Sequence, residues 1–399
     1  MKNTFLLLLI LTSSLNAQWI KTANGLPDPG ININCFTSHN GNLFMGAGGQ
    51  GVFYSTNNGD TWVQRLTNNS VYCLLSDSIT LYAGALTGGL RKSTNNGVNW
   101  STASLNKTVR SIIKSGNSLY AATDLDWVYR STNNGVNWIQ TGNIGFPIRA
   151  IIEVSNIIIA GTNSNDIYLS SNNGSNWINV TLNFGFNGAH CFTYNGTALF
   201  AGGAGGILPG VFKSTNSGSN WISSSFDTAN ITSLASIGNN IFAGTYDDNG
   251  VFWVSGDNGI SWHQRNEGLN VSELRALHIH NNYIFGGTWD SAVYRRPAGE
   301  VIGITQIGSS LPVNFILGQN YPNPFNPVTK LNFMLPKQGV TKLVILDITG
   351  REISIILDQR LEPGTYEIDW DASKYPSGIY FYSLQSGNFK ETKKMILIK

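Results

Sequence analysis

Three arginines and one histidine occupy the same position in successive units of a sequence repeat. When the innermost apolar segments of seven units are aligned, their first residues are Asn34, Tyr72, Arg110, Arg149, His190, Thr232 and Arg275. The forked donors of an arginine side chain match the planar oxyanions of carboxylates and phosphates. Equivalent positions that hold several arginines therefore indicate a site for an anionic ligand, and salt bridges that merely line a surface are the alternative.

Loops beside these positions add aromatic and acidic side chains. The candidate ligand site that we predict comprises Arg110, Arg149, Arg275, His190, Tyr72, Trp127, Trp289 and Asp248. A half-buried arginine needs a counter-charge. Either the neighbouring aspartates or a bound anion supplies that charge, and the aromatic residues are either core residues or platforms for a sugar.

One eight-residue phrase, present in six copies, organises the chain around these positions. Each copy begins with Ser and ends with Trp, and the closing Trp residues stand at 62, 100, 138, 177, 221 and 262, a period of 38 to 44 residues. A fixed period in that range is typical of an array or a propeller. The phrase resembles the Asp-box, or BNR repeat, although only Asp257 keeps the acid and five copies carry Asn there. We expect its side chains to form turns, not a metal site.

Each unit contains four short apolar stretches, which is the strand content of one propeller blade. A seventh unit follows Trp262 and has three such stretches and no box. Residues 19–26 parallel residues 262–269, so we expect the N-terminal strand to complete the last blade and close the ring. The prediction is an all-β protein with a seven-bladed propeller over residues 18–297. The three arginines are expected on the second, third and seventh blades, on one arc around the central channel.

The N-terminus and the composition indicate a secreted protein. Residues 1–17 contain a short apolar run and read as a signal peptide, too short to span a bilayer. The net charge of +2 excludes a polyelectrolyte partner such as nucleic acid. Three cysteines, an odd number, favour buried free thiols, with a bridge between Cys35 and Cys73 as the alternative. The five histidines lack zinc-ligand spacing, so we expect no metal site. We also expect no cofactor and no membrane span.

Composition changes after Pro297. We interpret residues 298–312 as a linker and residues 313–399 as a small Ig-like β-sandwich. This tail resembles the type A C-terminal sorting domain of the type IX secretion system, through NYPNPFNP at 320–327, DITG at 347–350, SGIYFY at 377–382 and KKMILIK at 393–399. The resemblance implies that the secretion machinery is a partner and that the protein crosses the periplasm to the outer cell surface or the medium. A purely structural module is the alternative for this tail.

Two functions remain for the propeller. The first is a binding or scaffold module whose channel face takes an extracellular glycan, anion or protein. The second is a glycoside hydrolase similar to sialidases, which also combine Asp-boxes with an arginine triad. Against the second, residues 146–149 do not form the Arg-Ile-Pro motif of that family, and glutamates are scarce for a reaction that needs two placed carboxylates.

Overall fold

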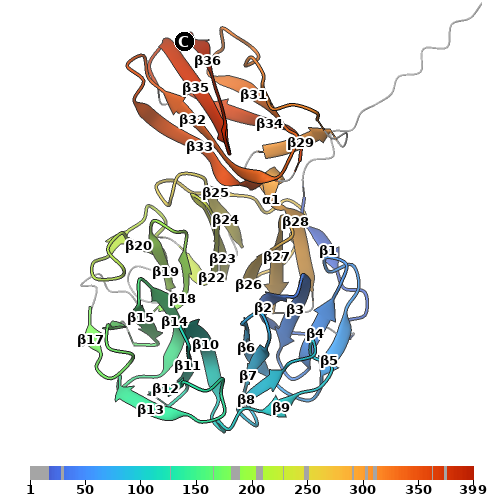
Figure 1. Cartoon of the computed structure of the whole chain (residues 1–399), viewed down its shortest axis with the longest axis vertical. Helices are drawn as coiled ribbons and strands as arrows, with labels where there is room; N and C mark the ends of the chain where they lie inside the picture. The colour runs from blue at the N-terminus through green and yellow to red at the C-terminus, as the bar shows by residue number, and fades with distance from the viewer. Residues whose placement is uncertain are drawn as a thin grey trace, which may run out of the picture.

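The computed structural model describes most of the chain. The described residues are 18–27, 31–125, 127–164, 166–180, 189–203, 210–227, 229–246, 251–289, 292–301, 304–308, 312–361, 363–372 and 375–399. The signal peptide predicted at residues 1–17 lies outside them. Seven four-stranded antiparallel sheets surround a centre, and a separate two-sheet domain lies at the rim of this ring (Figure 1).

The first four blades follow the chain without interruption, each with its first strand innermost. The first blade contains β2 (Ile33–His39), β3 (Asn42–Ala47), β4 (Gly51–Ser55) and β5 (Val63–Leu66), and the second contains β6 (Val71–Ser76), β7 (Leu81–Ala85), β8 (Leu90–Ser93) and β9 (Ser101–Thr102). The third blade contains β10 (Val109–Ser115), β11 (Ser118–Thr123), β12 (Trp127–Ser131) and β13 (Ile139–Asn143), and the fourth contains β14 (Ile148–Val154), β15 (Ile157–Thr162), β16 (Ile167–Ser170) and β17 (Ile178–Asn179).

The remaining three blades complete the ring. The fifth blade contains β18 (Ala189–Tyr194), β19 (Leu199–Gly203), β20 (Gly210–Ser214) and β21 (Ile222–Ser223), and the sixth contains β22 (Asn230–Ile237), β23 (Asn240–Tyr246), β24 (Phe252–Ser255) and β25 (His263–Gln264). The seventh blade contains β26 (Leu274–His280), β27 (Tyr283–Thr288), β28 (Val293–Pro297) and, from the other end of the chain, β1 (Ile20–Thr22). The predicted closure of the ring by the N-terminal strand is therefore confirmed, and no open edge remains between the last blade and the first.

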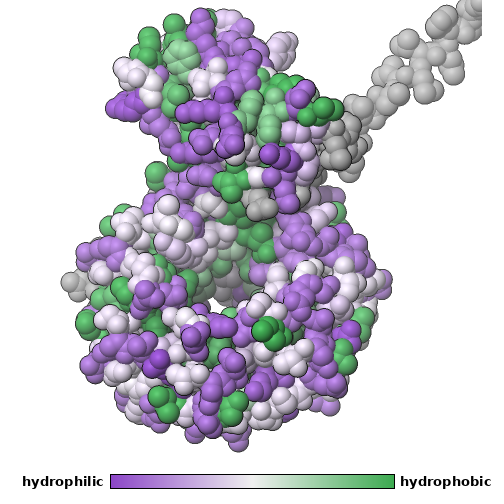
Figure 2. All heavy atoms as spheres, viewed as in Figure 1, coloured by the Kyte–Doolittle hydropathy of each residue, from purple (hydrophilic) through white to green (hydrophobic). Residues whose placement is uncertain are grey.

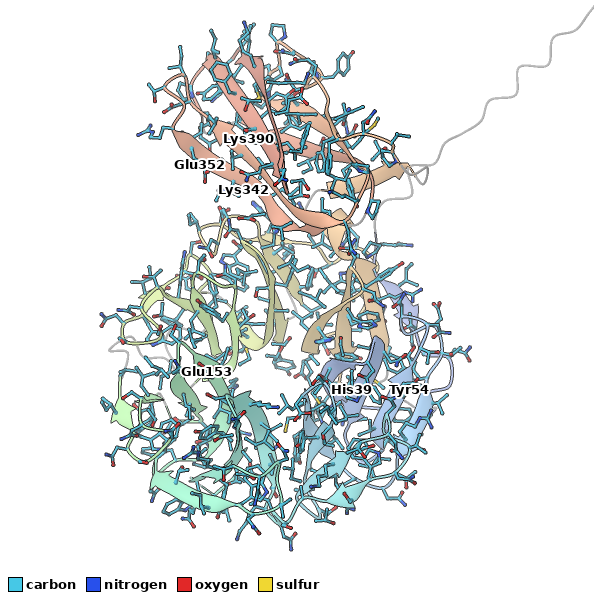
Figure 3. All side chains as sticks on the ribbon, in the orientation of Figure 1. His39, Tyr54, Glu153, Lys342, Glu352 and Lys390 are labelled. Carbon is cyan, nitrogen blue, oxygen red and sulfur yellow. The ribbon has the colours of Figure 1, made fainter. Side chains whose placement is uncertain are left out.

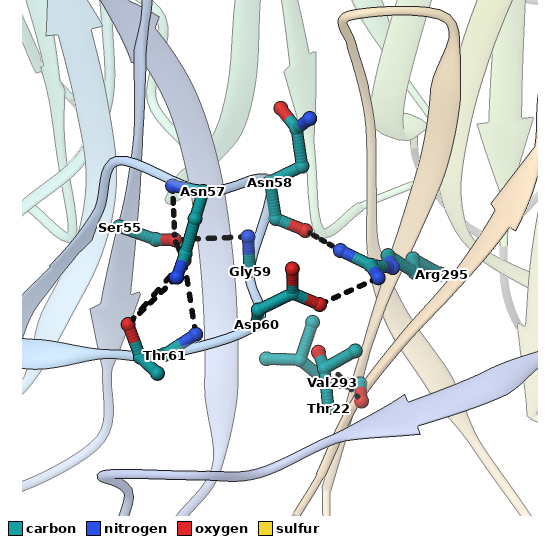
Figure 4. A network of polar contacts seen from close by, with 9 residues as sticks. All are labelled: Thr22, Ser55, Asn57, Asn58, Gly59, Asp60, Thr61, Val293 and Arg295. Atoms are coloured by element: carbon teal, nitrogen blue, oxygen red, sulfur yellow. Dashed lines mark hydrogen bonds and ion pairs between the residues drawn. The ribbon is translucent and has the colours of Figure 1, made fainter.

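Each box phrase forms the turn between the third and fourth strands of a blade. In the first box, the Ser55 hydroxyl accepts from the amide of Gly59 at 2.9 Å, and Asn57 Oδ1 accepts from the amide of Thr61 at 3.0 Å (Figure 4). Gly59 has a φ of +81°, in the left-handed region that glycine tolerates. The same serine-to-glycine bond recurs in all six boxes. These bonds satisfy turn amides, so the Asn found where the Asp-box has Asp retains its structural role.

Small residues occupy one equivalent position near the start of every innermost strand. The slot holds Cys35, Cys73, Ser111, Ala150, Cys191, Ser233 and Ala276. A Cβ on Gly46 would lie 2.5 Å from Cys35 Sγ and 2.7 Å from Val71 of the next blade, so the thiol fills the contact between two blades. All three cysteines are free, and burial raises the pKa of the Cys73 and Cys191 thiols to about 12. The prediction of free thiols is confirmed, and all three cysteines are half-buried.

Histidines and serines join neighbouring blades at the far end of the innermost strands. The Ser38 hydroxyl of the first blade lies 2.8 Å from His278 Nε2 and 2.9 Å from His280 Nδ1 of the seventh. His39 Nδ1 lies 2.8 Å from the Ser76 hydroxyl of the second blade. In Figure 3, His39 lies nearer the middle of the ring than Tyr54 of β4. Burial, and to a smaller extent the neighbouring His280, lowers the pKa of His278 to about 4.

We expect this buried histidine to make the propeller less stable in mild acid. The folded-state pKa lies below the ordinary value of about 6.5, so the unfolded chain binds the additional proton as the pH falls from 6.5 towards 4. The free energy of unfolding should then fall by up to about 1.4 kcal/mol per pH unit, or about 3 kcal/mol by pH 4. Denaturant unfolding of the wild type and of His278→Gln measures this, because the variant should lose most of that slope. His263→Gln, on the exposed outer strand, is the control, and equal slopes in all three proteins would contradict the assignment.

The C-terminal domain is a sandwich of two four-stranded antiparallel sheets. One contains β29 (Ile304–Gly308), β34 (Gly364–Asp371), β31 (Val328–Leu335) and β30 (Ile316–Leu317); the other contains β33 (Glu352–Leu361), β32 (Gly339–Leu346), β35 (Gly378–Ser386) and β36 (Phe389–Leu397). Its apolar core includes Phe333, Trp370 and Tyr382. On its surface, Lys342 and Glu352 lie on paired strands and form an ion pair of 3.1 Å (Figure 3).

The predicted linker at residues 298–312 is more structured than expected. It begins with the short helix α1 (Ala298–Val301), whose residues Ala298 and Val301 are buried in the apolar cluster of the last blade. It continues with β29, which pairs with β34, so the sandwich takes its first strand from before residue 313. The alternation of apolar and polar residues over β29 was too short to predict this strand. Within the described residues, no helix has the length and apolar character that crossing a membrane requires.

Candidate anion-binding site at the channel mouth

A bulge at the start of each innermost strand positions the predicted ring of side chains. In the third blade the pairing jumps from Val109 to Ser111, which leaves Arg110 outside the ladder, and every other blade has the same irregularity. A bulge leaves one residue unpaired and changes the direction of its side chain. The seven residues at the bulges are those of the alignment, namely Asn34, Tyr72, Arg110, Arg149, His190, Thr232 and Arg275.

These seven side chains and Glu273 line one open cavity of about 380 Å³, the channel mouth. Below it, the channel continues as a cavity of about 310 Å³, lined by the same ring and by the slot of small residues. Figure 2 shows the hollow in the middle of the disc. The volume of the channel mouth lies within the range of small-ligand sites, about 300–1,000 Å³. The repeat alignment therefore predicted seven of the eight residues around this cavity.

Arg110 has internal partners. Its guanidinium lies 3.9 Å from the centre of the Tyr72 ring and donates to both oxygens of Asp124, at 2.5 and 3.1 Å. Its side chain is one quarter exposed. Tyr72 and Asp124 thus hold this guanidinium in one orientation at the channel mouth.

Arg275 also has internal partners. It donates to Glu273 Oε1 at 3.1 Å and to Asn34 Oδ1 at 3.2 Å, and its guanidinium lies 3.7 Å from the centre of the Trp289 ring. Glu273 was missed as a site residue, because a glutamate two positions before the aligned residue has no counterpart in the other units. Arg275 is therefore a fixed cation that is already balanced by one carboxylate.

Arg149 and His190 differ from the other two cations. They come from the adjacent fourth and fifth blades, and Arg149 is exposed. Among the described residues, no carboxylate lies within 4 Å of either side chain, and neither side chain has a hydrogen-bond partner. Burial lowers the pKa of His190, and the positive charge of Arg149 lowers it further. Arg149 is therefore the cation of the channel mouth that has no described counter-charge, and His190 lies on the next blade as a protonatable neighbour.

Two ring residues have structural roles instead. Asn34 donates from its amide to the carbonyl of Val71 at 2.9 Å, and the Thr232 hydroxyl donates to the carbonyl of Leu274 at 2.6 Å. In both cases the acceptor belongs to the first strand of the next blade. These bonds tie neighbouring blades together at the mouth of the channel.

A second cavity adjoins the channel mouth between the sixth and seventh blades. We call it the side groove; it has a volume of about 720 Å³ and is lined by Asn230, Thr232, Tyr246, Ser272, Glu273, Arg275 and Trp289. Tyr246 and Trp289 are 58% and 46% exposed, respectively, so both present aromatic surface to solvent. Trp289 was predicted as a site residue and lies in this groove.

Other sequence predictions fare differently. Trp127 starts β12 and is half-buried, but it lines neither the channel mouth nor the side groove. Asp248 lies outside the described residues. The expected blade numbers were wrong: the arginines lie on the third, fourth and seventh blades, so two blades separate Arg275 from Arg110. In the described part of the chain, no three His, Cys, Asp or Glu side chains come together to hold a metal ion.

Two family models match parts of the chain. Residues 319–399 match the secretion system C-terminal sorting domain, and residues 84–276 match the DUF6242 beta propeller domain. No curated protein matches the chain.

Solved structures share the fold at low sequence identity. Ycf48 from Cyanidioschyzon merolae is 14% identical with a TM-score of 0.57, over 71% of this chain and 99% of its own. A structure of Ycf48 bound to D1 peptide is 16% identical with a TM-score of 0.57, over 70% and 96%. PorZ of Porphyromonas gingivalis, a surface component of the type IX secretion system, is 14% identical with a TM-score of 0.55, over 94% of this chain and 60% of its own.

Fold and family models together define the class of protein. It is a β-propeller protein that carries a C-terminal sorting domain. That domain marks proteins exported by the type IX secretion system, so the protein is delivered to the cell surface or the extracellular space and the secretion machinery is one of its partners.

Proposed function

We propose that the propeller is a binding module that takes an anionic ligand at the channel mouth outside the cell. The observation that carries this proposal is the pair formed by Arg149 and His190, cationic or protonatable side chains without a described partner in an open cavity of about 380 Å³. Arg110 and Arg275 are each balanced by a carboxylate, so the positive charge at this cavity that lacks a described counter-charge is that of Arg149. A carboxylate or phosphate would supply the counter-charge that this arc lacks.

Two further observations favour binding over hydrolysis. A propeller of similar fold, Ycf48, has been solved in complex with a peptide, which supports a binding role for such a ring. Glycoside hydrolysis needs two placed carboxylates. The two described carboxylates nearest the channel mouth, Asp124 and Glu273, are each ion-paired with an arginine, so we do not favour the hydrolase.

The proposal also covers the export route and the division of the chain into functional parts. Residues 1–17 act as the signal peptide that leads the chain into the periplasm, and the six box turns are of the Asp-box kind. Residues 18–301 form the binding unit, and the sandwich beyond them serves export. The buried positions of Ala298 and Val301 against the last blade support this boundary.

Substitution of Arg149 tests the proposed site. We expect Arg149→Gln to weaken the binding of a small oxyanion by about tenfold or more, because a charge-assisted pair is lost at the cation without a described partner. Calorimetric titration of the mature chain with galacturonate, citrate and inorganic phosphate measures this effect. Lys21→Gln removes an exposed charge from the outer strand β1 and is the matched control. If none of the three anions binds the wild type, the proposal is wrong.

His190 makes a second prediction at the same site. Its lowered pKa leaves the ring neutral at pH 7.5, and a bound anion favours the protonated form. The affinity for galacturonate should therefore rise as the pH falls from 7.5 to 5.5, and His190→Gln should remove most of that rise. A pH dependence that is identical in wild type and variant would place the anion away from His190.

A further inference from the structure

The channel mouth and the side groove form one continuous site, and we infer that they bind an acidic oligosaccharide together. This inference rests on the proposed function, because the acidic group is placed at Arg149 and His190. The remaining sugar units extend past Thr232 into the side groove. The ligand would thus cross the fourth, fifth, sixth and seventh blades on one arc.

Shared lining residues establish the continuity of the two cavities. Thr232, Glu273 and Arg275 line both the channel mouth and the side groove. The order of the blades places His190 beside Thr232, and Thr232 beside Arg275. A ligand anchored at Arg149 and His190 therefore reaches the side groove without leaving the protein surface.

The aromatic residues of the side groove suit the faces of sugar rings. Trp289 is 46% exposed, and Arg275 stacks on its indole at 3.7 Å, which fixes the orientation of the ring. Tyr246 is 58% exposed on the neighbouring blade. An exposed aromatic ring that is already held in place, as Trp289 is, presents a large apolar face at low entropic cost. The carbon-bound hydrogens of a pyranose ring pack well against such a face.

The polar lining favours sugar hydroxyls over a peptide strand. Glu273 Oε1 accepts from Arg275, which leaves Oε2 to accept from hydroxyl groups. The backbone of Tyr246 already pairs with that of Glu273 as an isolated antiparallel bridge, so the adjoining strand end is not free to add a peptide strand there.

The test compares ligands that use one part of the site or both. Calorimetry on the mature full-length chain would use galacturonate, trigalacturonate, a neutral galactotriose and a tetraglutamate peptide. We expect trigalacturonate to bind about tenfold tighter than galacturonate, and galactotriose to bind much more weakly than either. Trp289→Ala and Tyr246→Ala should each weaken trigalacturonate binding severalfold and leave galacturonate unchanged. Trp289→Phe should restore most of the loss, and Arg149→Gln should weaken both acidic sugars.

Tyr194→Ala, at a 40% exposed tyrosine of the fifth blade outside both cavities, is the matched control and should change neither affinity. Equal affinities for galacturonate and trigalacturonate, with no effect of Trp289→Ala, would overturn the inference and leave the proposed anion site intact. Tighter binding of tetraglutamate than of trigalacturonate would also overturn it. Failure of every acidic probe, galacturonate included, would overturn the anion site itself.

Discussion

Deletion of residues 18–26 should lower the melting temperature of the propeller by about 10 °C or more. The deletion removes β1, whose residues Ile20, Lys21 and Thr22 pair with Arg295, Tyr294 and Val293 of β28. Without it, the last blade has three strands and an open edge. A ring-shaped protein then loses the contact that joins the two ends of its chain.

The residue before β1 contributes most of this effect. Trp19 is 2% exposed; its indole nitrogen donates to the Arg265 carbonyl at 3.0 Å, and its ring lies edge-on to Phe252 at 4.7 Å. Truncation of a buried Trp to Ala costs about 3–5 kcal/mol. At about 2 °C per kcal/mol for a domain of this size, Trp19→Ala alone should lower the melting temperature by about 6–10 °C.

The segment after β1 also joins the last blade to the first. The carbonyl of Asn24 accepts from the amide of Trp62 at 2.9 Å. Arg295 of β28 donates to the carbonyl of Asn58 and forms an ion pair of 2.6 Å with Asp60 in the first box turn (Figure 4). Thus the closing strand and the strand it pairs with both contact the first blade.

Calorimetry of the wild type, the deletion and Trp19→Ala measures the effect, with the propeller transition separated from that of the sandwich. Ile20→Ala is the matched control, because Ile20 lies in the same strand but is 52% exposed. It should shift the melting temperature by no more than about 1 °C. An unchanged melting temperature after deletion of residues 18–26 would contradict closure by this strand.

The sequence could predict the ring of side chains because a repeat converts positions along the chain into positions in space. Arg110 and Arg149 align in the sequence, and the same bulge in each blade then directs both side chains to the channel mouth. The parallel between residues 19–26 and 262–269 predicted the closing strand in the same way. The sequence therefore predicted the features that all repeat units share.

The sequence did not predict features that occur in one repeat unit alone. The pairing of Arg110 with Asp124, and of Arg275 with Glu273, depends on where loops of individual blades place their carboxylates. The side groove depends on the ends of β23 and β27, where Tyr246 and Trp289 lie. Trp127 is the first residue of β12, and it lines neither cavity. No period or propensity distinguishes these cases in advance.

Within the sandwich, contacts explain why the motifs at the two ends of the sorting domain occur together. Asn320 is 2% exposed; its amide nitrogen donates to Thr329 Oγ1 at 2.9 Å, and its backbone amide donates to the Tyr382 hydroxyl at 2.8 Å. The Phe325 amide donates to the Ile396 carbonyl at 3.0 Å, and the Ile398 amide donates to the Phe325 carbonyl at 2.9 Å. The motif at residues 320–327 and the C-terminal strand thus form one unit.

Removal of that unit should abolish export. The cut belongs after Val301, because α1 packs on the last blade, whereas a cut at residue 313 would leave β29 without its partner β34. In a host with a type IX secretion system, we expect the full chain at the surface or in the medium and the chain lacking residues 302–399 in the periplasm.

Cell fractionation with an antibody to the propeller measures the cellular location of each chain. The melting temperature of purified residues 18–301 should match the propeller transition of the full chain, which shows that retention does not reflect misfolding. A periplasmic reporter fused to residues 302–399 is the complementary control and should be exported, because the family match at residues 319–399 and the strand β29 both lie within that fragment. Efficient surface display of the chain without residues 302–399 would show that the propeller itself carries an export signal.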